Sequence, residues 1–186
     1  MKQHLKDTPN SIVGEMGLDG IAKDRDTKLV YPMDVQMRLF EQQFQLASQL
    51  QKPVSMHAVQ VYGKVYEFFR SLAKSQDAHV PPSIMLHSYS GSPEIASQLI
   101  RLPQIGPRFY FSFSSFVNAR SPKMLDRIRA IPHDRILLES DLHETSLVDD
   151  AMYSILEIVA QVKGWTLEET VDRVVENTSR FLGNVQ

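Results

Sequence analysis

Two carboxylates and two histidines stand near the ends of apolar runs, where parallel α/β proteins place their chemistry. They are Glu15 in "GEMGLD", His57 in "PVSMHAV", His87 in "SIMLHSY" and Asp141 in "RILLESDL". A carboxylate in a buried strand is costly unless it is paired or bound to a cation, so Glu15 is expected to have a partner. Oxygen and nitrogen ligands without sulfur suit Zn²⁺, Mn²⁺ or Mg²⁺.

Each of these residues alone has an ordinary structural explanation. A histidine at a strand end is more often a hydrogen-bonded core residue than a ligand. Glu15 could pair with a lysine or arginine of a neighbouring strand, and Asp141 could cap the following loop. The four residues together are more informative, because side chains from four strands converge only if the sheet curves into a barrel. We therefore expect all four at one end of the sheet.

The elements that would hold these residues alternate between strands and helices. Apolar side chains recur at spacings of three and four from Pro32 to Gln51, which predicts a helix, and Thr166 with Glu169 predicts a capping box. The expected strands span residues 12–19, 53–59, 83–89, 109–116 and 135–142, and the expected helices span 32–51, 63–74, 92–102, 121–131, 149–163 and 166–182. Strands separated by helices indicate a parallel sheet with right-handed crossovers.

The composition is that of an ordinary globular domain, expected to span residues 1–186. The chain is 42% hydrophobic and 23% charged, and its net charge of −2 gives no overall attraction to nucleic acid or membranes. It contains no cysteine, which excludes disulfides, thiolate zinc sites and cysteine nucleophiles. We find neither a signal-peptide core nor an apolar run of transmembrane length. A soluble protein of the cytoplasm or the nucleus is the expectation.

Four motifs resemble those of a known family. In order and spacing, "GEMGLD", "PVSMHA", "LHSYSGS" and "LLESDLHE" resemble the downstream motifs of the TatD-related metal-dependent hydrolases, as does the tail "ENTSRFLG". Those proteins are (β/α)8-barrel nucleases of the amidohydrolase type. The stretches "HSYSGSPE", "FYFSFS" and "ESDLH" are closer still to a fungal subgroup. Its members are described as interacting with a tetratricopeptide subunit of the anaphase-promoting complex.

The resemblance implies a role for each of the four residues. Glu15 would bridge two divalent metal ions, and His57 and His87 would ligate one of them. Asp141 would ligate the other ion and would orient or deprotonate the attacking water, which makes Glu15 and Asp141 the catalytic residues. The implied reaction is two-metal hydrolysis of a phosphodiester, with DNA as the expected substrate.

The chain also departs from the family pattern. It lacks the His-x-His pair that the family carries on its first strand. The resemblance therefore implies a partial TIM-barrel-like (β/α) metallohydrolase fold, with about five of eight βα units, the first strands missing and two open edges. We expect such a chain to bind metal weakly and to hydrolyse DNA poorly.

Three further residues are candidate substrate contacts. Tyr89 and Ser90 lie in "HSYSGS", which replaces the family's "HCFSGS". His143 stands where the family usually has proline, and it could reach a scissile phosphate or could be an exposed loop histidine.

Two other functions remain open from the sequence. The chain could be a non-catalytic partner of a helical-repeat (tetratricopeptide) cell-cycle protein. The missing His-x-His pair favours that function, and the four retained ligands oppose it. It could also be an amidohydrolase acting on cyclic C–N bonds, although "HSYSGS" and "ESD" favour the nuclease branch.

Overall fold

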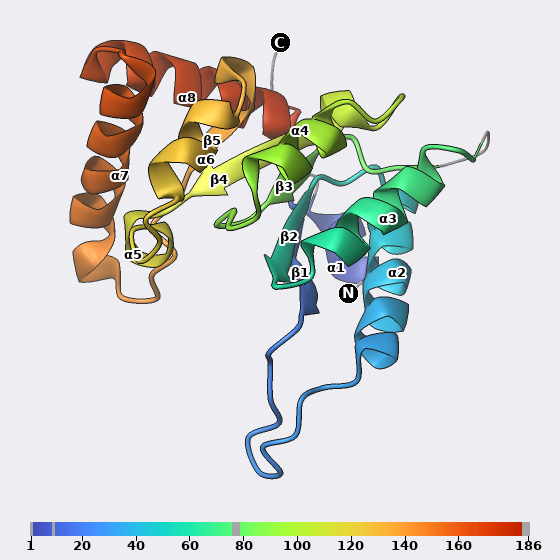
Figure 1. Ribbon diagram of the computed structural model, residues 1–186. Helices are drawn as coiled ribbons and strands as arrows, with labels where there is room; N and C mark the ends of the chain where they lie inside the picture. The colour runs from blue at the N-terminus through green and yellow to red at the C-terminus, as the bar shows by residue number, and fades with distance from the viewer. Residues whose placement is uncertain (1, 9, 76–78, 184–186) are drawn as a thin grey trace.

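Five parallel strands form one sheet in the order β1-β2-β3-β4-β5 (Figure 1). The computed structural model describes residues 2–8, 10–75 and 79–183. The strands are β1 (Val13–Asp19), β2 (Val54–Val59), β3 (Ile84–Leu86), β4 (Phe109–Phe113) and β5 (Ile136–Leu138). Within the described residues β1 and β5 each pair on one side only, so the sheet does not close into a barrel. The predicted α/β fold with a partial barrel is confirmed.

Helices follow the strands largely where the sequence predicts them. They are α1 (Lys2–Asp7), α2 (Met33–Gln49), α3 (Tyr62–Leu72), α4 (Pro93–Ile100), α5 (Ser115–Asn118), α6 (Met124–Ala130), α7 (Val148–Lys163) and α8 (Leu167–Leu182). The Ser92 side chain caps α4 by accepting from the Ile95 N–H, and Thr166 caps α8 by accepting from the Glu169 N–H. The Thr166 cap agrees with the sequence analysis, and serine is a favoured residue at the position that Ser92 takes.

Several boundaries differ from the expected ones. The strands expected over 83–89 and 135–142 already end at Leu86 and Leu138. The strand expected over 109–116 ends at Phe113, because Ser114 turns the chain and caps the short helix α5. The helix expected from residue 121 begins at Met124, since the Ser121 hydroxyl accepts a hydrogen bond from Arg127 instead of capping a helix. The short helix α1 was not expected from its polar sequence; it contributes one buried side chain, Leu5, to the core.

The two faces of the sheet carry different side chains. One face holds the main apolar core, in which strand residues such as Leu18, Leu86 and Phe111 pack against α2, α3, α4, α6 and α7. The other face holds a small cluster in which Phe181 of α8 packs against Tyr110 and Leu137. Because side chains alternate along a strand, residues that continue the alternation of Met85 and Leu137 toward the C-terminal strand ends lie on this second face, away from the main core. The predicted metal ligands lie there.

Gly17 marks a close approach between β1 and β2. A Cβ atom at this position would lie 1.9 Å from the His57 carbonyl oxygen, and the φ angle is +156°. We expect Gly17→Ala to lower the free energy of unfolding by at least about 2 kcal/mol, as measured by urea denaturation, because backbone would have to move. Gly63→Ala is the control, since nothing lies within 4 Å of a Cβ there. Equal stabilities of the two variants would contradict the close approach.

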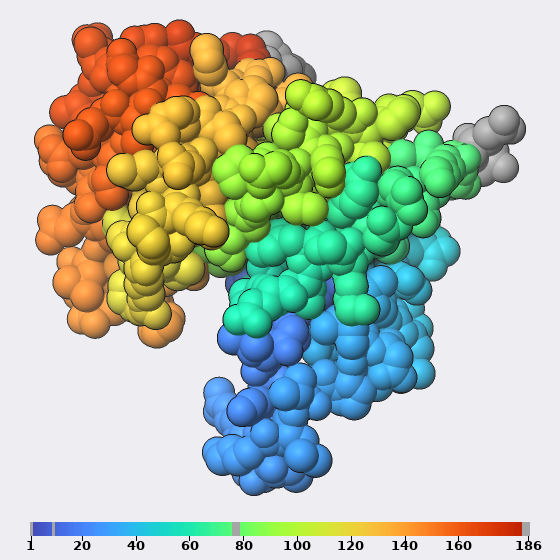
Figure 2. Space-filling model, viewed as in Figure 1, coloured from blue at the N-terminus to red at the C-terminus, as the bar shows by residue number. Residues whose placement is uncertain are grey.

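The segment 20–31 projects from the body of the molecule (Figures 1 and 2). It folds back on itself through an antiparallel bridge between Lys23 and Val30. The Asp24 carboxylate accepts hydrogen bonds from the backbone of Asp26 and Thr27, and the Thr27 bonds keep the pKa of Asp24 below its ordinary value. None of the described helices is both long and apolar enough to cross a membrane.

Candidate metal centre

The four predicted ligands lie together. Glu15 and His57 project from within β1 and β2, and His87 and Asp141 follow the C-terminal ends of β3 and β5. Glu15 Oε1 lies 2.8 Å from His57 Nδ1 and 3.6 Å from His87 Nε2. His87 Nε2 lies 3.4 Å from Asp141 Oδ1. All four residues line a cavity of about 260 Å³. In Figure 2 the surface is hollowed between the yellow-orange region around α5 and the blue and teal region that contains β1 and β2.

The strand register and two sharp backbone turns bring these residues together. His57 is paired with Gly17 across β1 and β2, and the backbone N–H of His87 donates to the Met56 carbonyl at 2.9 Å. The chain then leaves β3 and β5 through left-handed residues, Ser88 (φ 41°) and Asp141 (φ 55°). These turns direct the His87 and Asp141 side chains toward the same cavity.

Two carboxylates that the sequence analysis did not assign as ligands complete the cluster. Glu139 Oε2 lies 2.8 Å from His87 Nδ1, and Asp19 Oδ2 lies 3.1 Å from His57 Nε2. Ser88 also contributes, because its hydroxyl donates to Glu139 Oε1 at 2.7 Å and lies 3.0 Å from Asp141 Oδ2. The sequence signal for Glu139 was its position two residues before Asp141 on one strand end. Asp19 had an equivalent signal at the end of "GEMGLD".

The electrostatics of the cluster are dominated by negative charge around one imidazole. Burial opposes the charged form of His87, but the hydrogen bond that His87 donates to Glu139 and the charges of Glu139, Glu15 and Asp141 outweigh it and raise the pKa to about 9. Burial likewise disfavours ionised Glu139, yet its bonds to His87 and Ser88 hold the pKa of this carboxyl below its ordinary value. The carboxylates therefore favour the protonated, charged form of His87 when no cation is bound.

The side chains present fit a divalent cation. His87, Glu139 and Asp141 each offer a ligand atom, and these atoms lie within 4.8 Å of one another. The donors are imidazole nitrogen and carboxylate oxygen, which suit Zn²⁺ and Mn²⁺ and, through oxygen, Mg²⁺. A cation bound here would supply the positive charge that the protonated His87 ring otherwise offers to the surrounding carboxylates.

The exposure of Glu15 differs from the expectation. Its side chain is 43% exposed rather than buried. The physical reason is that β1 is an edge strand with an irregular register between Val13 and Met16, so the apolar neighbours Met16 and Leu18 are buried while Glu15 faces the open side. The carboxylate is therefore partnered by histidine at the surface of the cavity.

Comparison with known proteins places the chain in a family. A family model described as "TatD related DNase" matches residues 1–183. The chain belongs to this family. It is 31% identical to the Cut9-interacting protein scn1 of Schizosaccharomyces pombe, covering 97% of this chain and 65% of that protein. It is 30% identical to the uncharacterized metal-dependent hydrolase YabD of Bacillus subtilis, covering 91% of this chain and 64% of that protein.

A solved structure shares the fold. The crystal structure of a TatD homologue, YjjV of Escherichia coli, is similar with a TM-score of 0.77 and 20% sequence identity, covering 100% of this chain and 69% of that one. The TatD chain described here thus spans 65% and 64% of the length of the two curated relatives named above.

The three candidate substrate contacts of the TatD chain lie in different environments. Ser90 lines the cavity, and its hydroxyl lies 2.9 Å from that of Tyr62. Tyr89 is fully buried and donates to the Ser92 carbonyl, so the expectation that it contacts substrate is wrong. The left-handed turn at Ser88 breaks the strand alternation and sends Tyr89 into the apolar core. His143 is exposed and is not among the residues that line the cavity, and its role stays a prediction.

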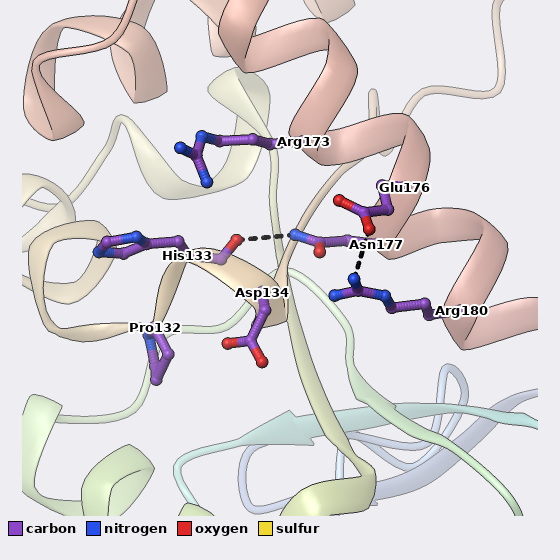
Figure 3. Close-up of a pocket in the computed structure, with 7 residues that line it drawn as sticks. All are labelled: Pro132, His133, Asp134, Arg173, Glu176, Asn177 and Arg180. Atoms are coloured by element: carbon purple, nitrogen blue, oxygen red, sulfur yellow. Dashed lines mark hydrogen bonds and ion pairs between the residues drawn. The ribbon is translucent and has the colours of Figure 1, made fainter.

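A larger cavity, of about 450 Å³, lies beside the start of β5 and not beside the strand ends that carry the cluster (Figure 3). It is lined by Pro132, His133, Asp134, Arg173, Glu176, Asn177 and Arg180. Arg173 is paired with Glu169 at 2.7 Å, Arg180 is paired with Glu176, and the Asn177 amide donates to the His133 carbonyl at 2.8 Å. Since the charged groups of α8 already satisfy one another, the histidine–carboxylate cluster is the candidate site.

Proposed function

We propose that this TatD family chain is a divalent-metal-dependent hydrolase of phosphodiesters, with DNA as its substrate. The observation that carries the proposal is the position of His87 Nε2, which faces Glu15 Oε1 at 3.6 Å and Asp141 Oδ1 at 3.4 Å inside a cavity. Three candidate ligands, from β1 and from the ends of β3 and β5, meet there, and the described residues that line the cavity include no arginine or lysine. The description of the family as DNases supports the choice of substrate class.

Some residues of the chain would hold divalent cations, and one would also accept a proton. Glu15, His57 and His87 would hold one ion, and Glu15 and Asp141 would hold a second, as the family resemblance implies. A bound divalent cation supplies Lewis-acid stabilisation of the charge that develops on the phosphoryl oxygens and lowers the pKa of water. Asp141 is the general base in this proposal, since the Ser88 hydroxyl lies 3.0 Å from its Oδ2 and leaves Oδ1 directed toward the cavity.

The number of ions held is part of the proposal. Glu15, His57 and His87 supply three ligands to one ion, whereas a second ion would keep only the Glu15 and Asp141 carboxylates, because the sequence contains no His-x-His pair. Three protein ligands with an open position are typical of catalytic zinc sites. We therefore propose that this chain holds one ion more firmly than a second and hydrolyses DNA slowly.

A single-turnover assay with Mg²⁺, Mn²⁺ and Zn²⁺ on single- and double-stranded DNA tests the function. We expect cleavage that EDTA abolishes and that Asp141→Asn slows by roughly 100-fold or more, because the general base is lost. Asp149→Asn, on the exposed side of α7, makes the same chemical change away from the cluster and is expected to keep the rate. Cleavage that survives EDTA, or equal rates for the two variants, would rule out the proposed role of Asp141.

A second candidate function is suggested by a relative's name. Since the S. pombe relative is named as a Cut9-interacting protein, this chain could bind a helical-repeat (tetratricopeptide) protein, in the cytoplasm or the nucleus. The exposed side chains of Tyr153, Val171 and Val175 between α7 and α8 border an apolar cavity of about 350 Å³ that suits a protein contact. Binding to a purified tetratricopeptide protein that survives Asp141→Asn and is lost in Tyr153→Ala would support it. No contact at the site favours the hydrolysis of cyclic C–N bonds.

A further inference from the structure

Each imidazole of the cluster has one nitrogen facing Glu15 and one facing an outer carboxylate. His57 places Nδ1 at 2.8 Å from Glu15 and Nε2 at 3.1 Å from Asp19. His87 has the opposite orientation, with Nε2 at 3.6 Å from Glu15 and Nδ1 at 2.8 Å from Glu139. The two rings therefore present different nitrogens to the centre of the cavity.

We propose that Asp19 and Glu139 are positioning residues that hold the two imidazoles in opposite tautomers. His57 would carry its proton on Nε2 and His87 on Nδ1, which leaves His57 Nδ1 and His87 Nε2 free to bind a cation. A neutral imidazole has one donor and one acceptor, so a carboxylate that accepts from one nitrogen fixes the lone pair on the other. This inference rests on the proposed function, because it takes the cluster to be a metal site.

Glu139 is fixed as an acceptor by its surroundings. Its Oε1 accepts from both the backbone N–H and the hydroxyl of Ser88, each at 2.7 Å, and its Oε2 faces His87. The side chain is largely buried, with 17% of its surface exposed. Because both oxygens already have partners, Glu139 is better placed to orient His87 than to ligate an ion itself.

Asp19 is fixed in a similar way. Its Oδ1 accepts from the backbone N–H groups of Ile21 and Ala22 at 2.8 and 2.9 Å, which leaves Oδ2 for His57. Its backbone is held on both sides by the Gln36 amide, which accepts from the Asp19 N–H and donates to the Asp19 carbonyl. Both outer carboxylates thus have one oxygen that accepts two hydrogen bonds, at least one of them from a backbone N–H, and the other oxygen directed at an imidazole.

Nitrogen NMR of histidine in the Zn²⁺-loaded chain tests the tautomers directly. Long-range ¹H–¹⁵N spectra distinguish a protonated ring nitrogen from a metal-bound one, and the spectra of His57→Ala and His87→Ala assign the two rings. We expect a protonated Nε2 in His57 and a protonated Nδ1 in His87. The same protonated nitrogen in both rings would overturn the proposal.

Metal affinity provides the second readout. In a chelator competition with Zn²⁺, Glu139→Gln and Asp19→Asn are expected to weaken binding roughly 10–100-fold, as is usual when a carboxylate behind a ligating histidine is lost. Glu144→Gln, an exposed glutamate near the site, is the control and should stay within about twofold. Asp19→Asn keeps an oxygen for the Ile21 N–H, and circular dichroism checks that each variant is folded.

The outcomes separate this inference from the proposed function. An unmodified chain that binds no Zn²⁺, or that binds it equally well after His87→Ala, would overturn both. The positioning role alone would be overturned if the chain binds Zn²⁺ through His87 but the Glu139→Gln and Asp19→Asn variants bind Zn²⁺ as tightly as Glu144→Gln does. A chain that retains Zn²⁺ on His87 Nδ1 would make Glu139 a neighbour of the ion and would likewise overturn it.

Discussion

Replacing His87 with alanine is expected to lower the affinity for Zn²⁺ by roughly 100-fold. His87 Nε2 is the nitrogen that faces both Glu15 and Asp141, so the variant removes the ligand shared by the two sides of the cluster. Structural zinc sites of about four ligands have apparent binding free energies of about 10–16 kcal/mol, or about 3 kcal/mol for each ligand. A loss of about 3 kcal/mol lowers the affinity by about two orders of magnitude. Metal-dependent cleavage of DNA should be lost with the ion.

The control for this prediction is His4→Ala. His4 is an exposed histidine on α1, so the variant removes one imidazole without touching the cluster. Chelator competition should show unchanged affinity for His4→Ala and a large loss for His87→Ala. Two variants that weaken binding equally would mean that Zn²⁺ binds to histidines without regard to position.

The sequence was sufficient to predict that Glu15, His57, His87 and Asp141 lie together, because the strands carry a simple signal. Apolar runs that end in a histidine or a carboxylate mark the C-terminal ends of parallel strands, and the Thr166 cap and the Gly164 stop mark the last two helices. The approach of His57 to Glu15 follows from that pattern, because neighbouring parallel strands end at the same edge of the sheet. The distances themselves depend on register, which the sequence does not specify.

The failures came from local backbone conformation. Tyr89 was a candidate substrate contact from its place in "HSYSGS", but the left-handed Ser88 turns the chain and Tyr89 is buried. A non-glycine residue in that conformation has no reliable sequence signal. The contacts of Asp19 and Glu139 were missed for another reason: they depend on ring orientation, which is set by side-chain packing between elements distant in the sequence.

Raising the pH from about 6.5 to about 9 is expected to destabilise the metal-free chain. The raised pKa of His87, about 9 against an ordinary value of 6.5, means that the folded protein holds the proton more tightly than the unfolded chain. The resulting stability is fully present below pH 6.5 and is lost as the pH rises through 9. The gap between the two values corresponds to about 3 kcal/mol. The lowered pKa of Glu139 also stabilises the folded state, but this stabilisation is lost only in acid, as the pH falls through the pKa of the folded protein.

Lys163 acts in the opposite direction over part of this range. Burial, with the nearby charge of Arg129, lowers the pKa of Lys163 from its ordinary value of 10.5 to about 8. The charged form of Lys163 therefore destabilises the folded state below pH 8, and this destabilisation disappears as the pH rises from about 8 to 10.5. The His87→Gln variant retains Lys163 and removes the titrating imidazole, so the difference between the two proteins isolates His87.

The measurement is urea denaturation in EDTA at several pH values for the unmodified chain and His87→Gln. The unmodified chain is expected to be the more stable at pH 6.5, where protonated His87 lies among Glu15, Glu139 and Asp141. Its advantage should shrink by about 3 kcal/mol by pH 9 and above. A difference that stays constant across this range would show that the carboxylates do not hold a proton on His87. The distances between that ring and the three carboxylates would then have to be larger in solution than in this structure.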